Sequence, residues 1–98
     1  MLKEIEREIT NTTLYSLPKR LTGGQSYFVL EVQEFVQNGL HFASGWMFHE
    51  YFPQDKLFLL EVNCKDLGEF LSYVENMDLS EFCSDYLWNA RRDKPFEN

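Results

Sequence analysis

Two histidines and two cysteines are the side chains in this sequence with the widest chemical repertoire. His41 and His49 stand on one predicted strand, where a rise of about 3.3 Å per residue separates them by about 26 Å. The two rings therefore cannot share a zinc ion, whose ligand nitrogens lie about 2.1 Å from the metal. Neither Cys64 nor Cys83 forms a zinc-binding spacing with a histidine or with the other cysteine. We expect no metal site and no cofactor.

Catalysis by a nucleophile requires an activated Ser or Cys beside a base. The chain has no Gly-x-Ser-x-Gly motif, and Cys83 lies on the apolar stripe of a predicted helix, where a thiol is usually unreactive. Most of the acidic residues fall on predicted outer faces, whereas catalytic carboxylates need burial or close like charges. Gly23-Gly24 belongs to no phosphate-binding motif. We therefore expect a protein that is not an enzyme.

The balance of charge narrows the class of partner. The 98 residues include 9 Lys and Arg and 16 Asp and Glu, which gives a net charge of −7. This charge disfavours direct binding to nucleic acid and to anionic membranes, which need clustered Lys and Arg. Aromatic residues make up 16% of the chain and argue against disorder. The length predicts one compact α+β domain over residues 1–98.

The compartment is inferred from the N-terminus and from cysteine usage. Charged residues interrupt the segment from Met1 to Glu8, so it does not resemble a secretory signal. No apolar run approaches the length of a membrane span. Two cysteines could form one disulfide, but no other feature indicates an oxidising compartment. We expect two reduced thiols in a cytoplasmic protein.

The first third of the chain combines a predicted helix with a connector. Leu2, Ile5 and Ile9 follow the spacing of one helical stripe, which predicts a helix over residues 2–13. The segment 17–24 contains Pro18 and two glycines, which interrupt regular structure and indicate a connector.

A β-hairpin is predicted around Asn38-Gly39, because both residues tolerate the positive φ angles of a type I′ turn. This turn sets a register in which Gln37 faces Leu40. The other predicted pairs are Phe35–Phe42, Gln33–Ser44, Glu31–Trp46, Val29–Phe48, Val36–His41, Glu34–Ala43, Val32–Gly45, Leu30–Met47 and Phe28–His49. A helix over residues 26–37 is the alternative, since some apolar positions there also fit a helical stripe.

A third strand and two helices complete the pattern. The apolar run Leu57–Val62 predicts a strand that is central or covered on both faces. The next helix has Asn63 as a candidate N-cap. The last helix has Asp78 as its candidate cap. Their apolar stripes consist of Leu67, Phe70, Leu71 and Val74, and of Leu79, Phe82, Cys83, Tyr86, Leu87 and Ala90.

The order α-β-β-β-α-α predicts the α+β fold class. We expect an antiparallel three-stranded meander packed by an N-terminal helix and two C-terminal helices. The hairpin carries apolar residues on both faces, so the N-terminal helix is expected to cover one face and the C-terminal helices the other. Alternatively, one face forms a subunit interface, since a monomer rarely exposes a large apolar patch.

An acidic surface on the two C-terminal helices is the main candidate for binding. Residues 61–85 carry seven acidic residues against Lys65 alone. Helical geometry places Trp88 about 160° from the centre of the apolar stripe, on the polar face with Glu81 and Asp85. Either the tail Lys94-Pro95-Phe96 covers this indole, or Trp88 anchors an interface. The predicted partner-binding residues are Trp88, Asp85, Glu81, Asp78, Glu75 and Glu69.

These observations favour a small, acidic, non-enzymatic protein-binding module. It would be an inhibitor, immunity or regulatory protein that masks a basic protein partner, such as a protein that acts on nucleic acid. One alternative is a homodimeric adaptor or structural subunit that uses the aromatic hairpin face. Another is a small enzyme or ligand-binding domain with an aromatic pocket near His41, His49 and Trp46.

Overall fold

A computed structural model describes residues 8–93 of the chain, and the side chains of residues 8–90. Four strands and three helices follow one another in this range. They are β1 (Glu8–Ser16), α1 (Lys19–Thr22), β2 (Phe28–Gln37), β3 (Leu40–His49), β4 (Leu57–Asn63), α2 (Leu67–Glu75) and α3 (Ser80–Asp93). The α+β class is confirmed.

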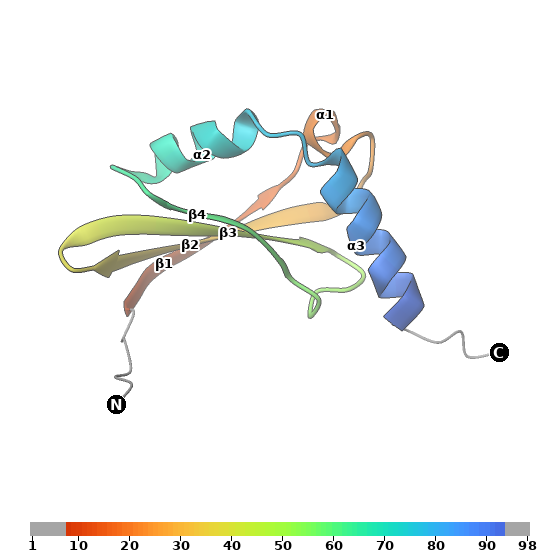
Figure 1. Cartoon of the computed structure of the whole chain (residues 1–98), viewed down its shortest axis with the longest axis horizontal. Coiled ribbons are helices and arrows are strands. Elements are labelled where there is room, and N and C mark those ends of the chain that lie inside the picture. The colour runs from red at the N-terminus through yellow and green to blue at the C-terminus, as the bar shows by residue number, and fades with distance from the viewer. Residues whose placement is uncertain (1–7, 94–98) are drawn as a thin grey trace.

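The strands form one antiparallel sheet in the order β1-β2-β3-β4, so each strand pairs with its neighbour in the sequence. The helices lie on one side of this sheet, with α2 along it and α3 across one end (Figure 1). The prediction of three strands is therefore wrong by one, because the segment expected to form the first helix supplies β1.

β1 replaces the predicted helix over residues 8–13, while the rest of that prediction, with Leu2 and Ile5, lies outside the described residues. Residues 9–16 contain the β-branched residues Ile9, Thr10, Thr12 and Thr13, which favour an extended backbone. The strand pairs with β2 from Glu8↔Val36 to Ser16↔Val29. The helical spacing of Leu2, Ile5 and Ile9 was therefore misleading for residues 8–13, because pairing with β2 makes this segment a strand.

The predicted β2–β3 hairpin is confirmed in all ten pairs, from Gln37↔Leu40 to Phe28↔His49. Asn38 and Gly39 have φ angles of 54° and 75°, as a type I′ turn requires. The alternative helix over residues 26–37 is wrong. A turn of two residues fixes the register, and the register determines which side chains face the helices.

β4 is an edge strand, so the prediction of a central or doubly covered strand is wrong. Among the described strands it pairs with β3 alone, and the Phe58 residue is 46% exposed. The pairs Gly45↔Leu60 and Trp46↔Phe58 leave Leu59 as an extra residue, which interrupts the register. The apolar run therefore reflects contacts with the helices and the neighbouring strand rather than cover on both faces.

The connector over residues 17–24 contains the single turn α1, which packs against the start of α3. Leu79 donates its backbone N–H to the carbonyl of Leu21 at 2.8 Å. Gly23 ends α1 in the left-handed region at φ 66°, and a Cβ added there would lie 2.6 Å from the Cβ of Ser80. Gly23 is thus required both by its backbone angle and by the close approach of α3.

The two long helices begin at carboxylate caps. Asp66, and not Asn63 as predicted, caps α2 and accepts from the backbone N–H of Glu69 at 2.9 Å. Asp78 accepts from the backbone N–H of Ser80 at 3.0 Å, which confirms the predicted cap of α3. Each cap satisfies a backbone donor that the first turn leaves unpaired.

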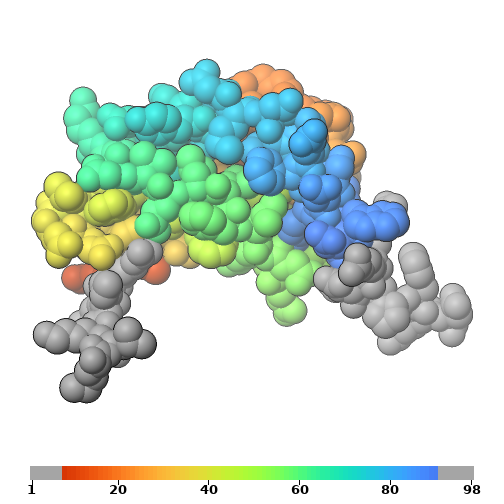
Figure 2. Space-filling view, viewed as in Figure 1, coloured from red at the N-terminus to blue at the C-terminus, as the bar shows by residue number. Residues whose placement is uncertain are grey.

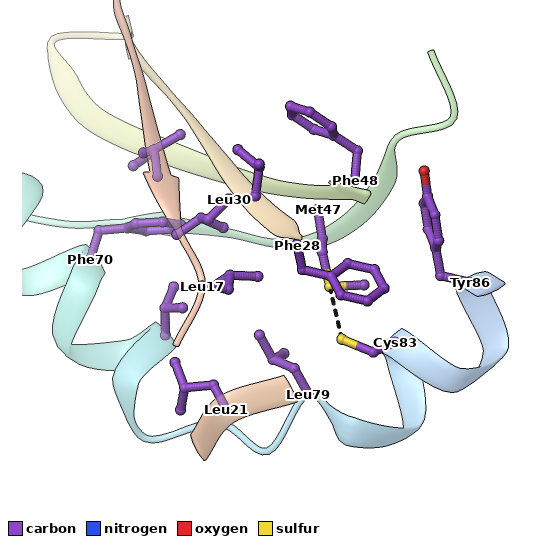
Figure 3. Packing of buried hydrophobic residues seen from close by; sticks show 14 of the residues in the cluster. Leu17, Leu21, Phe28, Leu30, Met47, Phe48, Phe70, Leu79, Cys83 and Tyr86 are labelled. Carbon is purple, nitrogen blue, oxygen red and sulfur yellow. Dashed lines mark hydrogen bonds between the residues drawn. The ribbon is translucent and has the colours of Figure 1, made fainter. Parts of the chain in front are cut away.

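The core lies between the helices and one face of the sheet (Figure 3). Phe28, Leu30 and Met47 from the sheet pack against Phe70 of α2 and against Leu79, which directly precedes α3, and all five are at most 2% exposed. The main contributors from α3 are Cys83, Tyr86 and Ala90. Phe82 belongs to the predicted stripe but is 39% exposed, so the buried face of α3 is narrower than predicted.

None of the described helices covers the other face of the sheet (Figure 1). Since β1 is a strand, the predicted cover by a helix over residues 8–13 is wrong. Near the centre of this face, the Lys56 ammonium contacts the Glu31 carboxylate at 2.9 Å. It also lies 5.7 Å from the ring centroid of Phe48, within the range of a cation–π interaction.

Replacing Gly23 by Ala should destabilise the fold more than replacing Gly24 by Ala. Both glycines have a positive φ, which costs a non-glycine residue about 1 kcal/mol. At Gly24 nothing lies within 4 Å of an added Cβ, whereas at Gly23 the methyl group would clash with Ser80. We expect a loss of about 3 kcal/mol for Gly23→Ala and about 1 kcal/mol for Gly24→Ala in urea unfolding. Equal losses would show that the contact between α1 and α3 relaxes without cost.

Candidate protein-binding surface on α3

The outer face of α3 combines acidic side chains with exposed aromatic rings. Trp88 is 67% exposed, and Glu81 and Asp85 on the preceding turns are exposed as well. These three residues are spaced by four and three positions, so they occupy one face of the helix. The adjacent ring of Phe82 is also exposed. Figure 2 shows α3, in blue, at the outside of the molecule.

Shallow hollows lie on both sides of this face. One hollow of about 610 Å³ separates α3 from the β3–β4 connection, with Leu57, Phe82 and Tyr86 among its lining residues. Two overlapping hollows of about 320 and 390 Å³ lie near the start of α3 and are lined by Ser80, Glu81 and Asp85. Asp85 lines all three hollows and so stands on the ridge between an aromatic hollow and an acidic one.

The three acidic residues of this surface have different local roles. Hydrogen bonds from the Ser80 hydroxyl and backbone N–H lower the pKa of Asp78. Its carboxylate is therefore ionised and engaged as a helix cap. Glu81 and Asp85 are exposed, and their carboxylates form no hydrogen bond or ion pair with another side chain among residues 8–90.

The predicted residues on α2 do not join this surface. α2 and α3 lie over different parts of the sheet (Figure 1). Glu75 lines a separate hollow of about 250 Å³ together with Arg20. Glu69 is half-buried in the first turn of α2. The structure thus brings together Asp78, Glu81, Asp85 and Trp88, and places Glu69 and Glu75 elsewhere.

The alternative site around His41, His49 and Trp46 is not assembled in one place. All three residues belong to β3, where successive side chains point to opposite faces. His41 and His49 face the helix side near opposite ends of the strand, whereas Trp46 lies on the other face. The indole N–H of Trp46 is buried without a hydrogen-bond partner among the described residues. These residues do not form a common pocket.

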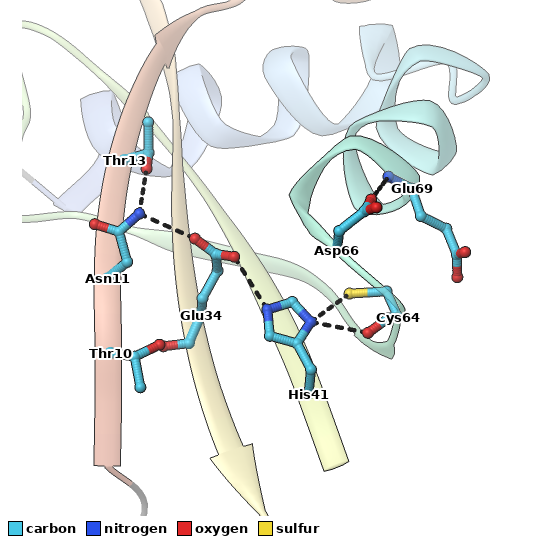
Figure 4. Close-up of polar contacts among 8 residues, drawn as sticks. All are labelled: Thr10, Asn11, Thr13, Glu34, His41, Cys64, Asp66 and Glu69. Carbon is cyan, nitrogen blue, oxygen red and sulfur yellow. Dashed lines mark hydrogen bonds and ion pairs between the residues drawn. The ribbon is translucent and has the colours of Figure 1, made fainter.

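His41 contacts both Glu34 and Cys64 near the β2–β3 turn (Figure 4). The Nδ1 atom of His41 lies 2.8 Å from the carbonyl oxygen of Cys64 and 3.6 Å from its Sγ atom. Its Nε2 atom lies 3.0 Å from the Glu34 carboxylate, which also accepts from the Asn11 amide at 3.0 Å. A carbonyl oxygen can only accept, so Nδ1 carries a hydrogen and is not a base for the thiol.

The electrostatics of this cluster oppose nucleophilic catalysis. Donation to the Cys64 carbonyl, followed by the hydrogen bond and charge of Glu34, raises the pKa of His41. Burial, together with the neighbouring carboxylates of Glu69, Glu34 and Asp66, raises the pKa of the Cys64 thiol. The arrangement therefore favours an imidazolium beside a neutral thiol, whereas a catalytic pair needs a thiolate.

His49 has the opposite environment. It is 7% exposed, and its ring packs against Tyr27, Phe28, Tyr51 and Phe52. The backbone N–H of Tyr51 donates to its Nδ1 atom at 3.1 Å. Burial lowers the pKa of His49, so the neutral ring is favoured and serves as a packing element.

Both cysteines are free thiols. Burial raises the pKa of the Cys83 thiol to about 11, and its Sγ atom contacts the Met47 sulfur at 3.7 Å. The described residues include no group of three or more His, Cys, Asp and Glu that could hold a metal ion. Among the same residues, no helix is long and apolar enough to cross a membrane.

Comparisons of the chain with protein-family models, with curated proteins and with solved structures gave no match. The function is therefore inferred from the residues and geometry of this chain alone.

The sequence analysis did not predict the cluster of His41, Glu34 and Cys64, although the predicted hairpin register already placed two of these residues close together. The predicted pairs Glu34–Ala43 and Val36–His41 make Glu34 and His41 diagonal neighbours on one face. Asn11 could not be placed because its segment was predicted to be helical. Phe82 was missed as a surface residue because its spacing fits the apolar stripe of α3.

The two histidines should titrate on opposite sides of the ordinary pKa of 6.5, His41 above it and His49 below it. The folded state binds the His41 proton more tightly than the unfolded state does. Its stabilisation is therefore complete below pH 6.5 and lost as the pH rises through the raised pKa of His41. Ring-proton NMR titration measures both values. Glu34→Gln should lower the pKa of His41 and leave that of His49 unchanged, and a parallel shift of both would refute this local cause.

Both thiols should react slowly with iodoacetamide at pH 7 in the native protein. Each is buried with a raised pKa, so little thiolate is present. We expect native rates at least about a hundredfold below those of the protein unfolded in urea. Mass spectrometry separates the two sites. Rapid alkylation of Cys64 in the native state would instead support a reactive, catalytic thiol beside His41.

Proposed function

We propose that the chain is a non-enzymatic binding module that docks the outer face of α3 onto a basic protein. In this proposal it acts as an inhibitor, immunity or regulatory protein that masks its partner's surface. The observation that carries the proposal is the 67% exposure of Trp88 on the same helix face as Glu81 and Asp85. A partner that itself acts on nucleic acid fits this chemistry, because its substrate groove is basic.

In this proposal, charge sets the association rate at this surface, and burial of an aromatic ring sets the dissociation rate. The exposed carboxylates of Glu81 and Asp85 attract a basic surface over several ångströms and raise the association rate. The Trp88 ring then loses contact with water and slows dissociation, as large aromatic side chains at interfaces commonly do. The hollows beside Phe82 offer space for side chains of the partner.

The exposure of Trp88 also bears on how the proposal is tested. The tail expected to cover this ring, residues 94–96, lies outside the described residues. A side chain that is 67% exposed contributes little to the core, so its removal should leave the fold intact. A loss of binding in Trp88→Ala can therefore be assigned to the interface.

The partner would first be captured from source-cell lysate on the immobilised protein at low salt and identified from the salt eluate. With the purified partner, the association rate should fall at least about tenfold between low and high salt. Trp88→Ala should weaken binding about tenfold or more, mainly through faster dissociation. Surface plasmon resonance measures both rates.

Matched variants on α2 provide the controls. Tyr73→Ala removes another exposed aromatic ring, which is 48% exposed. Glu75→Gln removes one negative charge from α2, and Asp85→Asn removes one negative charge from α3. The α2 variants should bind like the wild type, whereas Asp85→Asn should associate more slowly. Equal effects of the two charge variants, or a rate independent of salt, would reject docking through α3.

A further inference from the structure

Within the described part of the chain, β1 pairs with β2 alone, so its other edge is free. This edge is long and lacks most features that prevent pairing with another strand. β1 has nine residues, of which Glu8 is the only charged one, and it contains neither Lys nor Pro. Natural edge strands are commonly protected by short length, charge, proline or bulges. The register of β1 is irregular only between Ile9 and Asn11, which leaves residues 11–16 regular.

The hydrogen-bond pattern identifies the backbone groups at this edge. Leu17 donates to the carbonyl of Phe28 at 2.9 Å, which places this pair among the hydrogen-bonded ones. In an antiparallel ladder such pairs alternate, so Tyr15 and Thr13 also bond to β2. Thr12, Leu14 and Ser16 consequently direct their backbone N–H and C=O groups away from the sheet.

The side chains at the same positions suit self-pairing. Leu14 is 59% exposed and lies on the sheet face opposite the helices, in register with Glu31. If two copies of β1 pair antiparallel with Leu14 opposite Leu14, Thr12 of each copy faces Ser16 of the other. No charged residues face each other in this arrangement, and two exposed leucines become neighbours.

We propose that two copies of the chain associate through β1, with a two-fold axis at Leu14 that joins the two sheets into one. The axis is perpendicular to the sheet, so the helices of both copies lie on the same side. A contact of β1 with β1 uses the same edge of both copies and stops at the dimer, whereas a contact of β1 with β4 would leave one β1 edge and one β4 edge that could repeat the contact and form filaments. β4 is also the less suitable edge, since it is shorter, carries Glu61 and is irregular at Leu59.

This proposal is independent of the α3 surface, which takes no part in the pairing. The β1–β1 contact buries the area of one strand pair with adjoining side chains, which is smaller than a standard protein–protein interface. We therefore expect a dimer with a dissociation constant in the micromolar range.

Sedimentation velocity between about 1 µM and about 1 mM should show a reversible monomer–dimer equilibrium. Leu14→Lys should weaken dimerisation at least about tenfold, because two ammonium groups would face each other at the axis. Leu40→Lys is the matched control, since Leu40 is 51% exposed at the tip of the β2–β3 hairpin. It should dimerise like the wild type.

Hydrogen exchange locates the contact without any substitution. The amides of Thr12, Leu14 and Ser16 should exchange more slowly as the protein concentration rises, while those of α3 remain unchanged. A protein that stays monomeric throughout this range, or that assembles beyond the dimer, overturns the proposal. The proposal also fails if both lysine variants dimerise equally, since the contact then lies elsewhere.

Discussion

The two-residue turn at Asn38-Gly39 is the constraint on which the rest of the structure depends. Both residues have positive φ angles, so the turn is compatible with the right-handed twist of the two strands that it joins. It fixes the pairing of β2 with β3, and a shift by one residue would move Leu30 and Met47 from the core to the other face. The helices pack on the face that this register makes apolar. The positions of α2 and α3 thus follow from one local conformation.

The elements predicted correctly are those specified by local chemistry. The hairpin turn requires particular backbone angles, and the cap at Asp78 requires a short side chain with an acceptor oxygen before a run of apolar residues at helical spacing. The segment 8–13 was predicted to be helical because Ile9 fits a helical stripe, but its β-branched residues and the open side of β2 favour a strand. Pairing between segments decides such a case, and a single sequence does not contain that information.

The candidate site was predictable to a similar extent. Helical spacing placed Trp88, Glu81 and Asp85 on one face of a helix, and the structure agrees. Spacing within one helix could not show that Glu69 and Glu75 lie apart from them, because that depends on the angle between α2 and α3. The contact of His41 with Cys64 could not be predicted either, because it joins the start of β3 to the residue after β4 and so depends on the pairing of these two strands.

The attachment of α3 has a consequence for the entropy of binding. Its start is held by the hydrogen bond from Leu79 to Leu21, and its middle by the Tyr86 hydroxyl, which donates to the carbonyl of Phe52 at 2.9 Å. Cys83 lies between them in the core. A helix fixed at these points loses little backbone freedom when a partner binds, so the free energy of contact is not spent on ordering the chain. Only the side-chain rotamers of its outer face need to be fixed, and the face is already shaped before any encounter.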